Sequence, residues 1–138
     1  MVAPIEVTPV GTVESPLTDL AAAPKQGDEC APDAWLVFEP DVAPALDGLR
    51  TGDELIVLTW LDRADRAVLR VHPRGDRARP KQGVFGTRSP DRPNPIGLHR
   101  VTVLAFEGTR MRVSGLEAVD GTPLVDVKPV LSGEVGER

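Results

Sequence analysis

The chain has 138 residues but a single cysteine, no tyrosine and an aromatic content of only 4%. One thiol cannot form an internal disulfide or a multi-cysteine zinc site, so Cys30 is best explained as an ordinary small residue in a reducing compartment. A chain of this length can bury a sufficient hydrophobic core without such crosslinks. The composition therefore predicts one cytoplasmic domain over residues 1–138, with a core from about 6 to 130 and a tail at 131–138.

Long apolar runs and several well-known site motifs are also missing. No stretch approaches the roughly 20 apolar residues of a membrane helix, and the N-terminus lacks the pattern of a signal peptide, so we expect no membrane partner. His72 and His99 lie far apart without metal-ligand spacing, which predicts no metal site. The glycine motifs of dinucleotide-binding folds, the phosphate-binding P-loop and the Gly-x-Ser-x-Gly elbow are absent.

The charge is unevenly distributed. Residues 62–100 carry ten Lys or Arg and four Asp, a net charge of +6, whereas the whole chain carries −5 and the remainder therefore −11. A basic surface on an acidic protein can steer a polyanion to one place and keep it from the rest. The alternative is a set of solvated loop charges without a ligand.

Fourteen prolines and thirteen glycines leave few windows for long helices, and short runs rich in Val, Ile and Leu predict a mostly β protein. A helical turn or two is expected at residues 41–49 and another at 19–23, with a polar loop at 24–33. Strands this short and frequent favour a sandwich or a barrel, in which closure removes exposed edges. The expected strands are Ile5–Val13, Ala34–Phe38, Glu54–Leu61 (apolar enough to be covered on both faces), Ala67–Val71, Leu98–Phe106 and Thr109–Val113.

The most informative segment is Gly83–Gly97, GVFGTRSPDRPNPIG. Each of its last two prolines forces the residue before it, Arg92 or Asn94, into an extended conformation. The result is a stiff loop that presents Arg88, Arg92 and Asn94, which suits a ligand carrying a carboxylate or a phosphate. An ordinary proline-rich connection with solvated arginines explains the same residues.

Two further segments have plain explanations of their own. In residues 119–129, VDGTPLVDVKP, Asp120-Gly121 predicts a tight hairpin turn, and Asp126 and Lys128 share a strand face and could form an ion pair. In residues 12–17, TVESPL, a strand is expected to end in a turn at Ser15. Neither segment indicates a ligand by its composition.

Gly83–Arg100, GVFGTRSPDRPNPIGLHR, followed by Asp120–Pro129, DGTPLVDVKP, resembles the motifs of the TsaA-like family over about residues 6–130. Characterised members, of the TrmO type, are S-adenosylmethionine (SAM)-dependent methyltransferases that methylate N6 of threonylcarbamoyladenosine (t6A) beside the tRNA anticodon. The resemblance implies a small antiparallel β-barrel with few short helical turns, SAM as cofactor, tRNA as substrate and a homodimer with the SAM site near its interface.

Residue by residue, the resemblance implies cofactor contacts in three short segments and two single positions. These are Ser15, Pro16 and Leu17; Asp53 and Glu54; Arg92; Thr102; and Val119, Asp120 and Gly121. Substrate contacts are implied more weakly for Arg74, Arg88, Asn94 and Lys128. The chain departs from the family where Leu17 and Val130 replace aromatic residues and where the Asp53-Glu54 pair lacks a histidine, which weakens any case for base stacking there.

The reaction itself leaves several questions open. Asp120 or Glu54 could serve as the base, or the transfer could proceed with none. A methyltransferase acting on a small molecule, and a barrel that binds SAM, another adenosine ligand or RNA without turnover, are the alternatives. Only methyl transfer separates the enzyme from the binding module, and only the acceptor separates RNA from a metabolite.

Overall fold

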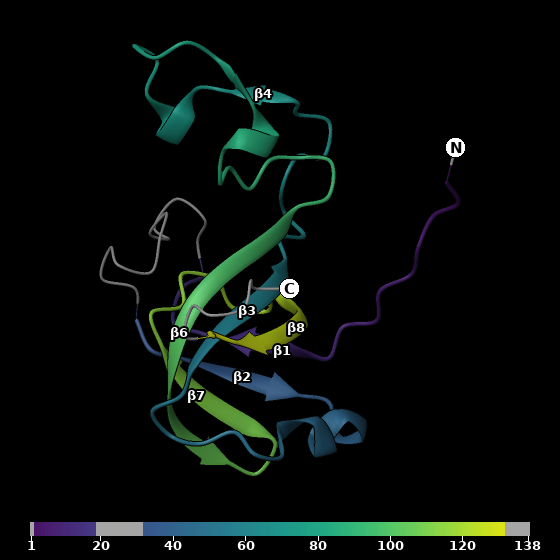
Figure 1. The fold of residues 1–138 in the computed structure, drawn as a ribbon, viewed down its shortest axis with the longest axis vertical. Coiled ribbons are helices and arrows are strands. Elements are labelled where there is room, and N and C mark those ends of the chain that lie inside the picture. Colours follow the sequence, from purple (N-terminus) through teal and green to yellow (C-terminus); the bar gives the residue numbers. More distant parts are fainter. Residues whose placement is uncertain (1, 19–31, 132–138) are drawn as a thin grey trace.

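The computed structural model describes residues 2–18 and 32–131, and its main feature is a closed barrel of six strands in the order β1-β2-β7-β6-β3-β8 (Figure 1). Every strand pair in the barrel is antiparallel, as the sequence predicts. The barrel strands are β1 (Gly11–Glu14), β2 (Ala34–Phe38), β3 (Glu54–Trp60), β6 (Ile96–Glu107), β7 (Arg110–Ser114) and β8 (Pro123–Pro129). No helix in these two ranges is long and apolar enough to cross a membrane.

The barrel interior is filled by one side chain in two from each strand. On β7 the apolar Met111 and Val113 are buried, and Arg110 and Arg112 point outward, as the alternation in the sequence predicts. The same alternation on β1 and β2 places Val13 and Leu36 inside. Closure through the β1–β8 pair leaves no open sheet edge, which a chain with so little helix could not otherwise cover.

Strand β3 differs from the expectation that both of its faces are covered. Its inward residues Leu55, Val57 and Thr59 are fully buried, but the outward ones are only half-buried. The outward side chains face no second layer in the described ranges, so an almost continuously apolar strand presents an apolar face on the outside of the barrel.

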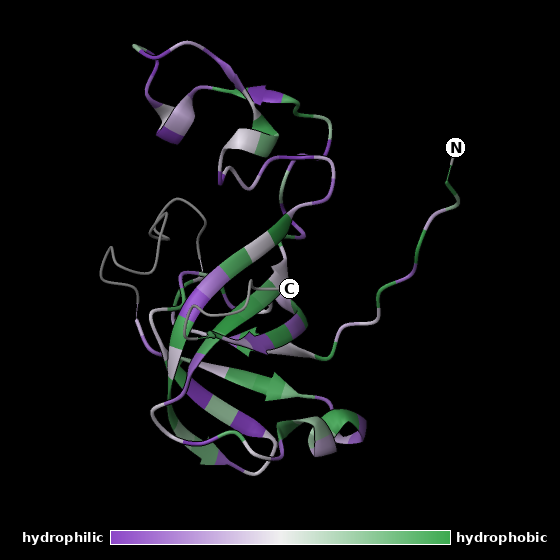
Figure 2. Ribbon diagram, viewed as in Figure 1, coloured by the Kyte–Doolittle hydropathy of each residue, from purple (hydrophilic) through white to green (hydrophobic). Residues whose placement is uncertain are grey.

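Residues 61–95, here called the arm, leave the barrel after β3 and return at β6. Trp60 and Ile96 are register partners and the N–H of Leu61 donates to the carbonyl of Pro95 at 2.8 Å, so the two ends of the arm lie side by side. The arm contains β4 (Arg70–Val71), β5 (Gln82–Gly83) and the 3-10 turns η3 (Pro73–Gly75) and η4 (Val84–Gly86). Figure 1 shows it standing away from the barrel, and Figure 2 shows that it is largely hydrophilic.

Several predicted boundaries differ from those observed. Residues 2–9 are exposed, Val10 packs against the core, and β1 begins only at Gly11. The segment 67–71 is strand only at its last two residues, which pair with β5 alone. The turn predicted at 41–49 is the 3-10 helix η2 (Pro40–Leu46). The turn at 19–23, Cys30, most of the loop at 24–33 and nearly all of the predicted tail lie outside the described residues.

The turn at Asp120-Gly121 forms as predicted, with Gly121 at φ 84°, but it does not close a hairpin between paired strands. Strand β7 pairs with β2 and β6, whereas β8 pairs with β1 and β3. The turn instead sends the chain across the end of the barrel, where it meets the end of β1.

Candidate functional site

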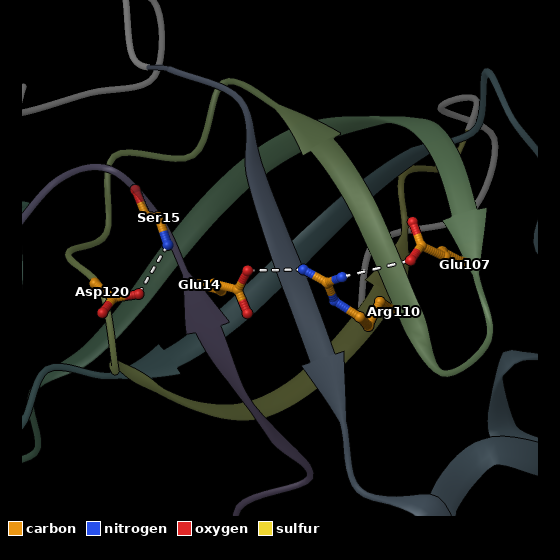
Figure 3. A network of polar contacts seen from close by, with 5 residues as sticks. All are labelled: Glu14, Ser15, Glu107, Arg110 and Asp120. Carbon is orange, nitrogen blue, oxygen red and sulfur yellow. Dashed lines mark hydrogen bonds and ion pairs between the residues drawn. The ribbon is translucent and has the colours of Figure 1, made fainter.

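Two segments that the sequence separates widely are joined by hydrogen bonds at one end of the barrel (Figure 3). The backbone N–H of Ser15 donates to Oδ1 of Asp120 at 2.9 Å, and the N–H of Asp120 donates to the carbonyl of Leu17 at 2.6 Å. The N–H of Leu17 donates to Oγ of Ser15 at 3.1 Å. Two of the segments expected to contact a cofactor, 15–17 and 119–121, therefore lie together at one end of the barrel.

The segment around Asp120 is held from both sides. The N–H of Gly121 donates to the carbonyl of Val13 at 2.7 Å, and the hydroxyl of Thr122 donates to the carbonyl of Val119 at 2.7 Å. Val119 and Thr122 are buried, while Asp120 is exposed between them. The turn thus fixes an exposed carboxylate on a rigid support, as a binding site requires.

A hollow of about 530 Å³ opens beside Ser15. Its lining consists of Ser15, Pro16, Glu14, Asp33, Trp35 and Arg112. Arg112 is paired with Asp33 at 2.7 Å, and the guanidinium of Arg110 lies 4.5 Å from the ring centroid of Trp35. Sequence reasoning missed Trp35 and Arg112, and only the register that pairs Glu14 with Trp35 brings them here.

A second group of predicted contacts lies at the other end of β3. Glu54 is the register partner of Thr102 and is ion-paired to Arg100 at 2.9 Å, while Oδ2 of Asp53 accepts the N–H of Arg50 at 2.8 Å. Six residue steps separate Glu54 from Trp60, which is about 20 Å along a strand. Because Ser15 and Asp120 lie at the Trp60 end, the structure does not bring these two groups together within one copy of the chain.

Arg92 and Asn94 lie in the arm and bond within it. Nε of Arg92 donates to the carbonyl of Ser89 at 2.8 Å, and its Nη2 donates to the carbonyls of Val84 and Thr87 at 2.7 and 2.5 Å. Oδ1 of Asn94 accepts from Nη2 of Arg66 at 3.0 Å. The arginine that sequence reasoning favours as a cofactor anchor therefore also holds the loop that precedes it.

The remaining predicted substrate contacts are spread over the molecule. Arg74 lies in η3 with φ 52°, and Arg88 is exposed on the arm. Lys128 is paired with Asp126 at 3.7 Å, as the sequence predicts, and lies opposite Ile56 of β3. Both side chains are about half exposed, so this pair contributes little to stability.

A buried polar chain supports the site from inside the barrel. Nδ1 of His99 lies 2.5 Å from Oε1 of Glu117, and its Nε2 lies 2.7 Å from Oγ1 of Thr59. A carboxylate only accepts, so Nδ1 carries a proton and donates it to Glu117. Glu117 belongs to the segment that leads to Asp120, so the chain ties that segment to β3 and β6.

In residues 2–18 and 32–131 no three His, Cys, Asp or Glu side chains cluster as metal ligands would. The described fold is thus a small antiparallel barrel with a projecting arm and a site built from backbone turns, one aromatic ring and paired charges.

Residues 12–133 match the family model of the tRNA-methyltransferase O N-terminal domain, and the chain belongs to this family. It is 46% identical over 125 residues to a probable S-adenosyl-L-methionine-binding protein of Methanothermobacter thermautotrophicus, covering 91% of this chain and 89% of that one. An S-adenosyl-L-methionine-binding protein of Archaeoglobus fulgidus is 41% identical over 120 residues, 87% of this chain and 85% of that one.

The crystal structure of TrmO from Pseudomonas aeruginosa superimposes with a TM-score of 0.74 at 28% identity. The match covers 99% of this chain but only 61% of the Pseudomonas chain. The resemblance to the TsaA-like family that the sequence indicates is confirmed, and so is the mostly β, barrel-like fold.

Proposed function

We propose that this protein is a SAM-dependent methyltransferase of the cytoplasm that methylates N6 of t6A next to the anticodon of tRNA. The observation that carries the proposal is the joining of Ser15–Leu17 to Asp120 at one end of the barrel. These two segments are among those for which the family resemblance implies cofactor contacts. Family membership and the names of the archaeal relatives support SAM as the cofactor.

The residues around the site fit SAM chemically. A hollow of about 530 Å³ is in the range of sites for ligands of this size. Glu14 and Asp33 are carboxylates suited to a positively charged sulfonium and ammonium, and Arg112 suits a carboxylate. Glu14 is paired to Arg110 and Asp33 to Arg112, each at 2.7 Å, so bound SAM would replace partners within these pairs. Trp35 offers an apolar ring for an adenine, in a chain where Leu17 has replaced the expected aromatic residue.

When bound, SAM supplies an electrophilic methyl group on a positively charged sulfur. The part left to the protein is to hold two reactants in line and to let the acceptor nitrogen lose its proton. The N6 of t6A carries an acyl group, which makes that proton easier to lose, so a weak base suffices. Asp120 suits this role because its Oδ1 accepts from Ser15 and its Oδ2 makes no bond to any described residue. Glu54 is less suited because it is paired to Arg100 at the other end of β3.

A homodimer fits the outer surface of β3 and β6. Leu58 faces Leu98, and Trp60 faces Ile96, so four large apolar side chains adjoin on the outside of the barrel. Ile96 and Leu98 remain 47% and 45% exposed in the single chain. An apolar strand pair of this kind is typical of an interface, and a second copy would cover it.

Binding of SAM without turnover is the second candidate, because the archaeal relatives are named for SAM binding and not for methyl transfer. The chain also spans only 61% of the Pseudomonas TrmO chain that it matches, so the activity of that protein comes to this chain only as a proposal. A binding module would hold SAM at Ser15–Asp120 and transfer nothing.

The deciding experiment measures transfer of a labelled methyl group from SAM to bulk tRNA, using tRNA with and without t6A, followed by nucleoside mass spectrometry. Methylated t6A only in the t6A-containing pool is the expected result. SAM binding by calorimetry with no label in either pool would contradict the enzyme and favour the binding module. Label in metabolite extracts but not in tRNA would contradict the RNA acceptor.

A further inference from the structure

The cations of the barrel strands and those of the arm differ in how they are neutralised. Each of the four barrel-strand cations is ion-paired to a carboxylate, namely Arg100 to Glu54, Arg110 to Glu14, Arg112 to Asp33 and Lys128 to Asp126. In the part of the chain that the structure describes, Arg70, Arg77 and Lys81 of the arm make no ion pair. The arm therefore carries cationic charge that nothing in its own fold neutralises.

These three cations meet around one hollow of about 390 Å³. Its polar lining is formed by Arg70, His72, Arg77, Lys81 and Ser89, and no carboxylate contributes to it. Nδ1 of His72 donates to the carbonyl of Arg79 at 2.9 Å, and the carbonyl of Ser89 is held by Arg92 at 2.8 Å. The two uncharged polar residues of the wall, His72 and Ser89, are thus each held by a hydrogen bond within the arm.

Three of the four carboxylates of the arm accept backbone N–H groups in its turns. Oδ1 of Asp76 accepts the N–H of Ala78, and Oδ1 of Asp65 accepts that of Ala67, each at 2.9 Å. Oδ1 of Asp91 accepts the N–H of Asp65 at the same distance. These contacts use the aspartates for backbone positioning and leave the cationic hollow to a ligand from outside.

An exposed aromatic ring lies a few residues from the hollow. Phe85 is 84% exposed and directly follows Val84, whose N–H donates to the carbonyl of Leu69 at 3.0 Å. Leu69 precedes Arg70, so this bond places the ring next to the β4–β5 pair that forms one wall of the hollow. A cationic groove with an adjoining exposed ring is the arrangement by which proteins hold unpaired nucleotides, with phosphates on cations and a base on the ring.

The charge of the whole chain favours one direction of approach. The arm carries nine Lys or Arg and four Asp, a net charge of +5, so the rest of the chain carries −10. A polyanion is therefore repelled by the barrel and attracted by the arm. A small phosphate compound would contact only the hollow. An RNA strand would also contact the exposed ring and be attracted by the positive charge of the whole arm.

We propose that the arm is an RNA-binding element, in which Arg70, Arg77 and Lys81 bind backbone phosphates and Phe85 stacks on an unpaired base. The proposal rests on the proposed function insofar as that function makes RNA the methyl acceptor. It assigns RNA binding to a place distinct from Ser15 and Asp120, so binding and methyl transfer can be measured separately.

The test uses the full chain and a fluorescently labelled single-stranded oligoribonucleotide, with affinity measured by anisotropy at several salt concentrations. The variant Arg70→Gln/Arg77→Gln is compared with Arg50→Gln/Arg100→Gln, which removes the same charge from the barrel. We expect the arm variant to bind about tenfold more weakly and to lower the slope of log affinity against log salt by about 1.4, since each lost phosphate contact on a single strand contributes about 0.7. The barrel variant should retain both affinity and slope.

Phe85→Ala provides an independent measurement. Its affinity for RNA should fall about tenfold with the salt slope unchanged, and its affinity for an abasic strand should equal that of the unaltered protein. Equal losses in the arm and barrel variants would overturn the proposal, and so would competition by inorganic phosphate at concentrations where other salts have no effect.

Methyl transfer separates this proposal from the proposed function. Methylation of tRNA that is unaffected by the arm variant would overturn the arm site and leave the enzyme intact. Arm-dependent RNA binding in a protein that transfers no methyl group would support the arm site and contradict the enzyme.

Discussion

Ser15 and Asp120 are 105 positions apart in the sequence, and the backbone N–H of the first donates to the carboxylate of the second at 2.9 Å. The bond couples the end of β1 to the turn before β8, so a change in the aspartate affects the segment that carries Pro16 and Leu17 as well. A side chain in this position has two separable functions, to accept a hydrogen bond and to carry a charge.

Asp120→Ala removes both functions, and we expect the affinity for SAM to fall at least about tenfold, or about 1.4 kcal/mol, by calorimetry. Asp120→Asn keeps an oxygen acceptor for Ser15 and should bind SAM nearly normally. If Asp120 is the base, this second variant should lose about a hundredfold in the rate of methyl transfer. Asp126→Ala, which removes an exposed carboxylate of β8, is the control and should change neither quantity.

Arg92→Ala should lower SAM affinity without unfolding the barrel, because all three of its described bonds go to carbonyls within the arm. Hydrogen exchange at residues 84–89 should become faster, while the thermal midpoint of the barrel stays close to that of the unaltered protein. Unchanged SAM affinity in the folded variant would rule out the anchoring role and leave Arg92 as a support of the arm.

Glu117→Ala should destabilise the protein by about 1–3 kcal/mol, because it leaves the Nδ1 proton of a buried histidine without an acceptor. Urea denaturation measures this free energy of unfolding. Glu107→Ala removes a carboxylate that is 69% exposed and lies as far as 3.7 Å from Arg110. This variant should lower the free energy of unfolding far less. Similar losses in the two variants would show that the His99–Glu117 contact contributes nothing specific.

Gly97→Ala should also be destabilising, by about 1–3 kcal/mol. A Cβ at this position would lie 2.4 Å from Oγ1 of Thr59 and 2.7 Å from Nε2 of His99, so it would push apart the two ends of a buried hydrogen bond. Gly83→Ala is the matched control, because a Cβ on Gly83 would meet nothing within 4 Å and its φ of −58° suits alanine. Thermal unfolding distinguishes the two variants, and equal midpoints would contradict the steric argument.

Leu98→Glu should convert the proposed dimer to a monomer in sedimentation experiments, because it places a charge in the centre of the apolar face of β3 and β6. Leu131→Glu is a close control, since both leucines are 45% exposed and only Leu98 lies on that face. Dimers in both variants, or a monomeric unaltered protein, would exclude this face as the interface.

Strand β7 could be predicted because its apolar and charged residues alternate strictly. In β7 each arginine follows or precedes a buried apolar residue, and this period of two is a local property of the sequence. The apolar run of β3 was harder to interpret. Periodicity alone does not distinguish a strand packed between two layers from a strand whose outer face is left uncovered in the single chain. Whether another layer or another protein covers the outer face of β3 is a property of the tertiary or quaternary structure, and no local sequence pattern contains it.

The site was predicted only through family resemblance, and the physical reason is that its parts meet through closure of the barrel. Ser15 and Asp120 are joined because β1 pairs with β8, and Trp35 joins them because β2 pairs with β1. Long-range register of this kind cannot be derived from the residues on either side of a turn. The basic stretch could be found by counting charge, but the contrast between the ion-paired cations of the barrel strands and Arg70, Arg77 and Lys81, which make no ion pair to a described residue, required the three-dimensional structure.

The pairing of Trp60 with Ile96 makes the arm, in effect, a very long hairpin loop. Its ends are fixed about 5 Å apart by the β3–β6 ladder whatever lies between them. Because the entropy of closing a loop rises only slowly with its length, an arm could be lengthened, shortened or exchanged with little effect on the folding of the barrel. This architecture lets the specificity of the molecule diverge in evolution independently of its scaffold.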